Sequence, residues 1–160
     1  MCKTIAKSII GIAFVAFCTN VFSEALPTSG KINLQSIYKA AFITKFNDDY
    51  SHGAVTGVTF NELGKGPLHM GKVACSLSIF SRKDIKKVIG FCTHEDKNGD
   101  EIFIQYGGTS SKEGEWNGTD DIIGGTGKYK GIQGSGPYSC TNSDKEGEFP
   151  CTAKIEYSLR

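Results

Sequence analysis

The sequence has little that favours a charged partner. Its 18 basic and 17 acidic side chains leave a formal charge of +1 over 160 residues. A near-neutral surface does not attract nucleic acid or an anionic membrane, so we expect neither as a partner. Proline is scarce too, and Pro67, Pro137 and Pro150 fall at the margins of predicted strands, where a missing N–H donor is tolerated.

Motifs for nucleophilic and phosphate chemistry are missing as well. Ser135 stands in Gly-Ser-Gly, without the spacing of a Gly-x-Ser-x-Gly elbow. The glycine-rich run 124–136 does not fit a phosphate loop, because Lys128 is followed by Tyr129 and not by serine or threonine. We interpret this run as a tight corner between two strands, where glycine relieves the close approach of the backbone.

Metal-binding patterns are absent in the same way. The run 96–100 (Asp-Lys-Asn-Gly-Asp) resembles the start of a calcium loop, but Gln105 occupies the position of the closing glutamate. No Cys-x-x-Cys pair accompanies the three histidines. The sequence therefore predicts a turn at 96–100, and it predicts no catalytic residue, no metal site and no cofactor.

The N-terminus has the features of a secretory signal. Lys3 and Lys7 form a positively charged segment before an apolar run at 8–17, and this run is too short to span a bilayer. Cleavage is expected after Ser23 or after Ala25, and the first site fits the small-residue rule better.

We therefore predict that residues 1–23 are removed and that 24–160 form a single domain of a secreted or periplasmic protein. Cys18 follows Phe17 and not a small residue, so we expect no lipid attachment and no stable membrane anchor. Removal of two lysines with the signal changes the formal charge from +1 to −1.

Four cysteines follow both expected cleavage sites and so belong to the predicted mature domain: Cys75, Cys92, Cys140 and Cys151. A hairpin between 72–80 and 88–95 sets the first two opposite each other and keeps the apolar alternation of both strands. A second hairpin, closed by the polar run 143–148, does the same for the other two. Four cysteines allow three pairings, and the sequence does not exclude the two crossed ones. In an exported protein we expect the two hairpin disulfides.

The turn after the strand 88–95 decides which side chains of the next strand, 101–106, share a face with Cys92. We expect a three-residue loop at 97–99, with Gly99 in the left-handed conformation of a β-bulge. This loop places Ile104 and Tyr106 on the same face as Cys92, whereas a two-residue Asn-Gly turn would place them on the opposite face. Apolar residues occupy that opposite face as well, so the sequence leaves open which face is the interior.

The chain supplies about eight strands with no helical period between them. The predicted strands, the first of them long and bent, cover 32–46, 55–60, 72–80, 88–95, 101–106, 116–123, 133–140 and 152–159. Eight is the usual count for a small closed antiparallel barrel. The predicted fold class is therefore all-β, a single antiparallel closed barrel with two hairpin disulfides.

Four segments together resemble a group of small exported bacterial proteins of uncharacterised function: 57–61 (Gly-Val-Thr-Phe-Asn), 66–69 (Gly-Pro-Leu-His), 96–103 (Asp-Lys-Asn-Gly-Asp-Glu-Ile-Phe) and 124–132 (Gly-Gly-Thr-Gly-Lys-Tyr-Lys-Gly-Ile). The last segment also resembles the closing corner of the allene oxide cyclase and dirigent barrels. This resemblance implies a calycin-like barrel of eight antiparallel strands. It implies no activity for this chain, because the functional side chains of those families do not align with it residue by residue.

Small barrels hold ligands in their mouths, so the leading hypothesis is a barrel that binds a small apolar or aromatic molecule, or a partner surface, without catalysis. A cyclase or isomerase that acts by positioning its substrate is the first alternative. A structural or secreted interaction (effector) protein is the second, and oligomerisation stays open. The ligand-binding candidates are amphipathic side chains near predicted strand ends: His69, His94, Tyr106 and Trp116.

Overall fold

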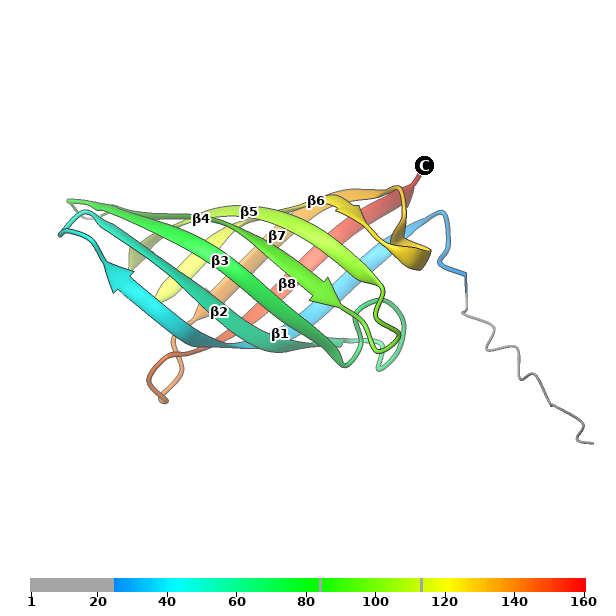
Figure 1. Ribbon diagram of the computed structural model, residues 1–160, viewed down its shortest axis with the longest axis horizontal. Coiled ribbons are helices and arrows are strands. Elements are labelled where there is room, and N and C mark those ends of the chain that lie inside the picture. Colours follow the sequence, from blue (N-terminus) through cyan, green and yellow to red (C-terminus); the bar gives the residue numbers. More distant parts are fainter. Residues whose placement is uncertain (1–24, 84, 113) are drawn as a thin grey trace, which may run out of the picture.

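The chain forms a closed β-barrel in the computed structural model, which describes residues 25–83, 85–112 and 114–160 (Figure 1). The predicted signal peptide therefore lies outside the described residues. Each strand pairs antiparallel with the next, and β8 pairs with β1, so the sheet closes on itself. This confirms the predicted all-β fold and its eight antiparallel strands. No helix among the described residues is long and apolar enough to cross a bilayer.

The strands are long, and closure leaves none of them with a free edge. They are β1 (Ser29–Lys45), β2 (Tyr50–Asn61), β3 (Gly71–Arg82), β4 (Ile85–Glu95), β5 (Glu101–Lys112), β6 (Glu115–Gly125), β7 (Ile132–Thr141) and β8 (Glu148–Leu159). A single turn of 3-10 helix, η1 (Gly127–Tyr129), precedes β7.

The observed strands extend beyond the predicted ones. The largest difference is at 81–87, the predicted connection between the strands 72–80 and 88–95 of the first cysteine hairpin. There β3 continues to Arg82 and pairs with Ile85 at the start of β4. The charged side chains suggested a loop, but both faces of a hairpin meet water at the rim of a barrel, so a strand tolerates them there.

The cysteine-bearing face of the sheet is the interior. Alternate residues of every strand point inward, and the side chains that are almost fully buried include Ile32, Leu34, Ile102, Ile104, Ile132 and Ile155. On β4, Val88 is buried whereas its neighbour Ile89 is 56% exposed. This alternation answers the question that the sequence left open.

Both predicted hairpin disulfides are present. Cys75–Cys92 joins β3 to β4 and Cys140–Cys151 joins β7 to β8, with Cα–Cα distances of 4.0 and 4.1 Å. The register of each hairpin around its disulfide is the predicted one. The chain-entropy model assigns about 3 kcal/mol of stabilisation to each loop of this length. Disulfides persist in oxidising compartments, so these two fit a protein that works outside the cytoplasm.

The turn between β4 and β5 also follows the prediction. Gly99 has a φ of +84°, and its N–H donates to the Asp96 carbonyl oxygen at 3.0 Å. The Asp96 N–H in turn donates to the Asp100 carbonyl oxygen at 2.9 Å. This geometry pairs Cys92 with Ile104 and keeps both on the inner face.

The first strand is irregular, as expected. Its pairing with β2 shifts between Ala40 and Phe42, which is the mark of a β-bulge. Because the bulge absorbs one residue, the inward alternation passes from Tyr38 to Ile43, and both line the interior. Phe42 is turned outward and is 53% exposed.

One end of the barrel is closed by two loops. The 62–70 loop inserts Leu68, which is buried and whose carbonyl oxygen accepts a hydrogen bond from the Thr59 hydroxyl at 2.7 Å. Figure 1 shows η1 at this end of the barrel, beside the C-terminus. The side chain of Tyr129 from η1 is fully buried. The glycine-rich run therefore forms a corner between two strands, as predicted.

A buried carboxylate connects this corner to the β4–β5 turn. The Oδ1 atom of Asp96 accepts hydrogen bonds from the N–H groups of Asn98 at 2.7 Å and Asp100 at 3.2 Å. Its Oδ2 atom accepts from the Tyr129 hydroxyl at 3.1 Å and pairs with the Lys128 ammonium group. Burial acts to raise the pKa of this carboxyl group, but the hydrogen bonds and the ammonium charge outweigh it and hold the pKa below its ordinary value.

Candidate functional site

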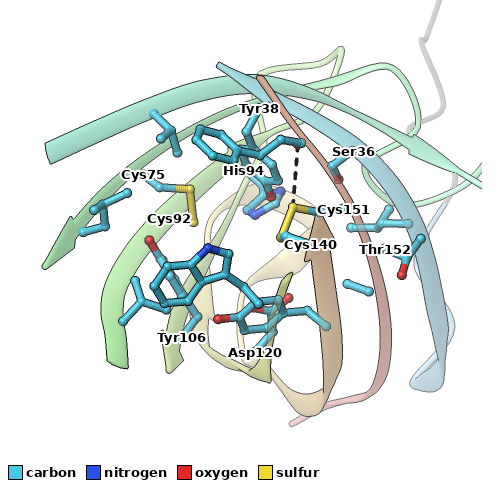
Figure 2. A pocket seen from close by; sticks show the side chains of 18 of the residues that line it. Ser36, Tyr38, Cys75, Cys92, His94, Tyr106, Asp120, Cys140, Cys151 and Thr152 are labelled. Atoms are coloured by element: carbon cyan, nitrogen blue, oxygen red, sulfur yellow. Dashed lines mark hydrogen bonds between the residues drawn. A yellow bond between two sulfur atoms is a disulfide. The ribbon is translucent and has the colours of Figure 1, made fainter. Parts of the chain in front are cut away.

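The other half of the barrel contains a cavity of about 220 Å³ (Figure 2). The cavity reaches the end of the barrel where β1 ends and β2 begins, opposite the closed end. Besides the two disulfides, its apolar lining comprises Leu34, Ile43, Val55, Leu77, Ile79, Val88, Phe149 and Ala153. Its polar and amphipathic lining comprises Ser36, Tyr38, His94, Tyr106, Trp116, Asp120, Tyr138 and Thr152. No lysine or arginine is among these lining residues.

Inward-facing glycines make room for two of the tyrosine rings. A Cβ atom on Gly90 would overlap the ring of Tyr106, its register partner on β5. A Cβ atom on Gly108 or Gly118 would overlap the ring of Tyr138. The two rings meet edge to face, with centroids 6.0 Å apart and planes at 87°. Tyr106 and Tyr138 therefore form two walls of the cavity at right angles.

Asp120 is the one acidic residue among these lining residues. It lies on β6 in phase with Trp116 and Ile122, which also face inward. Its register partner on β5 is Tyr106. No hydrogen bond or ion pair joins the carboxyl group to another residue in the described part of the chain. The cavity therefore contains an acid without a fixed partner.

The environment of Asp120 makes it titrate near neutrality. Burial raises the pKa of Asp120 to about 7, with a smaller contribution from the charge of Asp121. Asp121 itself points outward, and its Oδ1 atom accepts a hydrogen bond from the Ser135 hydroxyl at 2.7 Å. Two adjacent acids thus lie on opposite sides of the barrel wall, and burial holds the inner one partly protonated at pH 7.

Three tyrosines share the cavity with this carboxyl group. Burial raises the pKa of Tyr38, Tyr106 and Tyr138, and the negative charge of Asp120 raises each pKa further. Their hydroxyl groups therefore stay protonated at physiological pH. The Tyr106 hydroxyl donates to the Ser76 carbonyl oxygen at 3.3 Å, whereas the buried Tyr138 hydroxyl has no partner among the described residues. Figure 2 shows Tyr38 across the cavity from Tyr106 and Asp120.

His94 lies deeper, towards the closed end. Its side chain is 3% exposed, and the residue pairs in register with Val73 and Ile102. Its Nδ1 atom is buried and finds no hydrogen-bond partner within the described residues. Burial alone lowers the pKa of His94 to about 4, so the imidazole is neutral at physiological pH.

The structure brings together three of the four side chains that the sequence proposed as ligand contacts. His94, Tyr106 and Trp116 line the cavity. His69 does not, because the loop that carries it folds over the closed end of the barrel. There its ring meets the ring of Phe60 edge-on, with centroids 6.3 Å apart. Ligand binding by these residues stays a prediction.

Three cavity residues, Tyr38, Asp120 and Tyr138, were not among the ligand contacts predicted from the sequence. A signal for Asp120 was available, because the predicted strand 116–123 places this acid in phase with Trp116 and Ile122. Tyr138 stands two residues before Cys140 in the predicted strand 133–140, so the period of two places it on the cysteine face. Tyr38 lies in phase with Ile32 and Leu34, but its place beside Asp120 depends on closure of the sheet.

The outer wall carries apolar side chains too. On β1 and β2, the register partners Ile37 and Val58 are 51% and 43% exposed. On β4, Ile89 and Phe91 are both more than half exposed. The hypothesis of an interaction protein expected such a surface together with a filled barrel. The exposed apolar side chains are present, but the barrel contains a cavity.

Comparisons with known proteins extend the fold assignment and leave the activity open. No protein-family model matches the chain, and no curated protein matches it in sequence. Among solved structures, the barrel is similar to a protein described as pyocyanin demethylase. The two share 16% sequence identity with a TM-score of 0.51, over 81% of this chain and 100% of the other. At this identity the likeness shows the fold alone. The eight-stranded barrel that the sequence resemblance implied is present, but no family match supports membership of the allene oxide cyclase or dirigent group.

Proposed function

We propose that the protein binds a small aromatic or compact apolar molecule in the open half of its barrel. The observation that carries this proposal is a cavity whose lining combines aliphatic side chains, five aromatic residues and one carboxyl group without a hydrogen-bond or ion-pair partner among the described residues. Ligand sites are typically concave and mainly apolar, with a few polar groups that fix orientation. The closed half supplies the packed core, so the open half is free to hold a ligand without loss of the fold.

The size of the cavity favours a ligand of one or two rings. Its volume of about 220 Å³ exceeds the roughly 150 Å³ of an engineered apolar cavity that binds benzene. It is smaller than the roughly 300–1,000 Å³ of sites for drug-sized molecules. We therefore expect compact one-ring or two-ring compounds to bind in preference to an extended fatty acyl chain.

Two further observations support a small-molecule function outside the cytoplasm. The name of the similar structure states that it demethylates pyocyanin, so a barrel of this fold can act on a small molecule. The two disulfides favour an oxidising compartment, and with the N-terminal pattern they support export. We therefore place the proposed ligand in the periplasm or the extracellular medium.

Titration with one-ring and two-ring compounds tests the proposal. We expect saturable, one-to-one binding of tert-butylbenzene by isothermal titration calorimetry, and none of palmitate. Trp116 is the only tryptophan of the chain and lines the cavity, so its emission should change with the same saturation curve. Absence of binding for every compact aromatic compound tried would contradict the proposal.

Two adjacent residues of β8 provide a matched pair of variants. Ala153 lines the cavity, whereas Lys154 is exposed on the outer wall. Ala153→Phe should fill part of the cavity and weaken binding at least tenfold, while Lys154→Phe adds the same ring outside and should leave binding unchanged. Val88→Phe fills the cavity from β4 and serves if the first variant does not fold. Equal affinity in all three would place the ligand elsewhere.

A second candidate function is proton transfer in a cyclase or isomerase. The observation that favours it is an acid that titrates near 7 beside tyrosine hydroxyl groups that stay protonated. A base with such a pKa can take a proton from carbon at neutral pH, while a hydroxyl group stabilises the resulting enolate oxygen.

Deuterium exchange tests this second function. Small aryl ketones incubated with the protein in D₂O should gain deuterium at the carbon next to the carbonyl group. The rate should rise with pH through a midpoint near 7 and be lost in Asp120→Asn, which keeps the shape of the side chain. Exchange no faster than in buffer would leave the protein a binding barrel.

A further inference from the structure

We propose that the cavity selects a small organic cation, a quaternary ammonium or N-alkylated aromatic molecule, held between the rings of Tyr106 and Tyr138 and the carboxylate of Asp120. This inference rests on the proposed function and names the chemical class of its ligand. It follows from the kind of side chain that lines the cavity, from their geometry, and from what the lining lacks.

The charges of the lining favour a cation. Asp120 is its one acidic residue, and no lysine or arginine of the described chain lines the cavity to balance it. The carboxyl group makes no hydrogen bond or ion pair with a described residue. A carboxylate in an apolar cavity attracts a cation far more strongly than it would in water, and it repels an anion. A neutral ligand would leave the carboxyl group to take up a proton.

The aromatic residues favour a cation whose charge is spread over carbon. Tyr106 and Tyr138 meet at 87°, and Tyr38, Trp116 and Phe149 complete the aromatic lining. Aromatic rings attract cations through their negative faces, and proteins use such cages to hold quaternary ammonium groups. A methylated nitrogen has no N–H donors to satisfy, so it suits a lining with few free acceptors better than a primary amine, which carries three N–H donors.

A metal ion is a poorer match for the same site. Calcium requires six to eight oxygen ligands and magnesium requires six, whereas the lining offers one carboxyl group. The structure shows no group of three or more histidine, cysteine, aspartate or glutamate residues around a common point within its described part. The cation is therefore expected to be organic.

The proposal predicts a specific dependence on pH. The titratable groups that share the cavity with Asp120 are Tyr38 from β1, His94 from β4, Tyr106 from β5 and Tyr138 from β7, and Asp121 lies beside it on the outer face of β6. The tyrosines stay neutral up to high pH, and His94 is neutral above about pH 4. Between pH 5.5 and 8.5, ionisation of Asp120 is therefore the change expected inside the cavity.

Two probes of the same shape isolate the effect of charge. Phenyltrimethylammonium carries a quaternary nitrogen where tert-butylbenzene carries a carbon atom. By calorimetry at pH 8.5 we expect the cation to bind at least tenfold more tightly than its neutral isostere. At pH 5.5 its affinity should fall towards that of the isostere, by at most about 30-fold, the limit for a site whose carboxyl group has a pKa near 7. The affinity of the isostere should not fall on the same acidification.

Two adjacent acids supply the variant and its control. Asp120→Asn should abolish the preference for the cation at pH 8.5 and keep the binding of the isostere. Asp121→Asn removes the same charge from the outer face of the wall and should keep the preference. The carboxyl ¹³C resonance of Asp120 gives a second measurement, because saturating cation should lower its titration midpoint by at least one pH unit.

The outcomes separate this inference from the function on which it rests. Equal binding of the two probes, or a preference for the cation that persists in Asp120→Asn, overturns the inference and leaves the aromatic site intact. If neither probe binds, the proposed function and the inference both fail. Tighter binding of the cation with the stated pH dependence supports both.

Discussion

Asp120→Asn is expected to stabilise the barrel at pH 8 and to leave its stability almost unchanged at pH 4. In the unfolded chain the carboxyl group ionises with its ordinary pKa of 3.8, whereas in the barrel burial raises the pKa to about 7. Folding therefore forces the group to keep its proton, or to be buried as a charge, at any pH above 4. An asparagine of nearly the same shape has no such cost.

The sign of the effect follows from the direction of the shift. Below pH 3.8 the carboxyl group is protonated in both states and contributes no pH dependence. As the pH rises to about 7 the unfolded state loses its proton first, so the wild-type protein becomes less stable. Above pH 7 the difference is complete, and a shift of this size corresponds to roughly 2–4 kcal/mol, allowing for water that reaches the cavity from its open end.

Urea unfolding at pH 4.5 and pH 8 measures this effect. The midpoint of Asp120→Asn should lie well above that of the wild type at pH 8, and the two should approach each other at pH 4.5. Asp121→Asn is the control, because it removes an adjacent charge that faces solvent. If the inner and outer variants were equally stable at pH 8, Asp120 would not be buried in the way that the cavity requires.

A gain in stability on removal of an ionisable group is typical of a functional site. Binding and catalytic groups are often held in environments that cost stability, and the surrounding fold offsets the cost. The two disulfides lie in the same half of the barrel as Asp120 and line the same cavity. They join neighbouring strands in the half of the barrel where the cavity leaves the packing incomplete.

Alternation and turn chemistry were enough to predict most of the barrel from the sequence. The period of two residues predicted which side chains of β3 and β4 share a face. Placing the two cysteines of a hairpin opposite each other then left one possible register for its strands. Gly99 was decisive for β5, because a left-handed glycine in a three-residue loop keeps Ile104 on the face of Cys92. These are local constraints, and local constraints can be read from a single sequence.

The site could be predicted only in part, because it depends on closure of the sheet. Tyr38 and Asp120 come from strands on different sides of the cavity, and no spacing in the sequence relates them. His69 shows the reverse error. The sequence placed His69 near a predicted strand end and so proposed it as a ligand contact. Its loop instead covers the closed end of the barrel, where the neighbouring side chain of Leu68 is buried. Which end stays open is a property of the packed loops.

Asp96→Asn is expected to lower the stability of the barrel by about 3–5 kcal/mol at pH 7, the usual cost of removing one partner of a buried ion pair. The side chain of Asp96 is 5% exposed and that of its partner Lys128 is 18% exposed. The variant leaves the ammonium group of Lys128 in the closed end without a counter-charge. It also weakens the acceptor of the Tyr129 hydroxyl, which fixes η1 over the core.

The pH dependence of this variant runs opposite to that of Asp120→Asn. The pKa of Asp96 is lowered in the folded protein, so its contribution is complete above the ordinary value of 3.8 and is lost as the pH falls through the lowered pKa. The difference between wild type and variant should therefore be full at pH 7 and shrink as the pH falls below 3.8.

Glu156→Gln is a matched control for this loss. It removes the carboxylate from the ion pair of Lys31 with Glu156. The Nζ and Oε1 atoms of this pair lie 2.8 Å apart, but the two side chains are 72% and 73% exposed. Pairs in water contribute little, so this variant should unfold at nearly the wild-type urea concentration. A loss in Asp96→Asn no larger than in Glu156→Gln would show that the closed end does not depend on its buried carboxylate. The loops would then cover the core by apolar packing of Leu68 and Tyr129 alone.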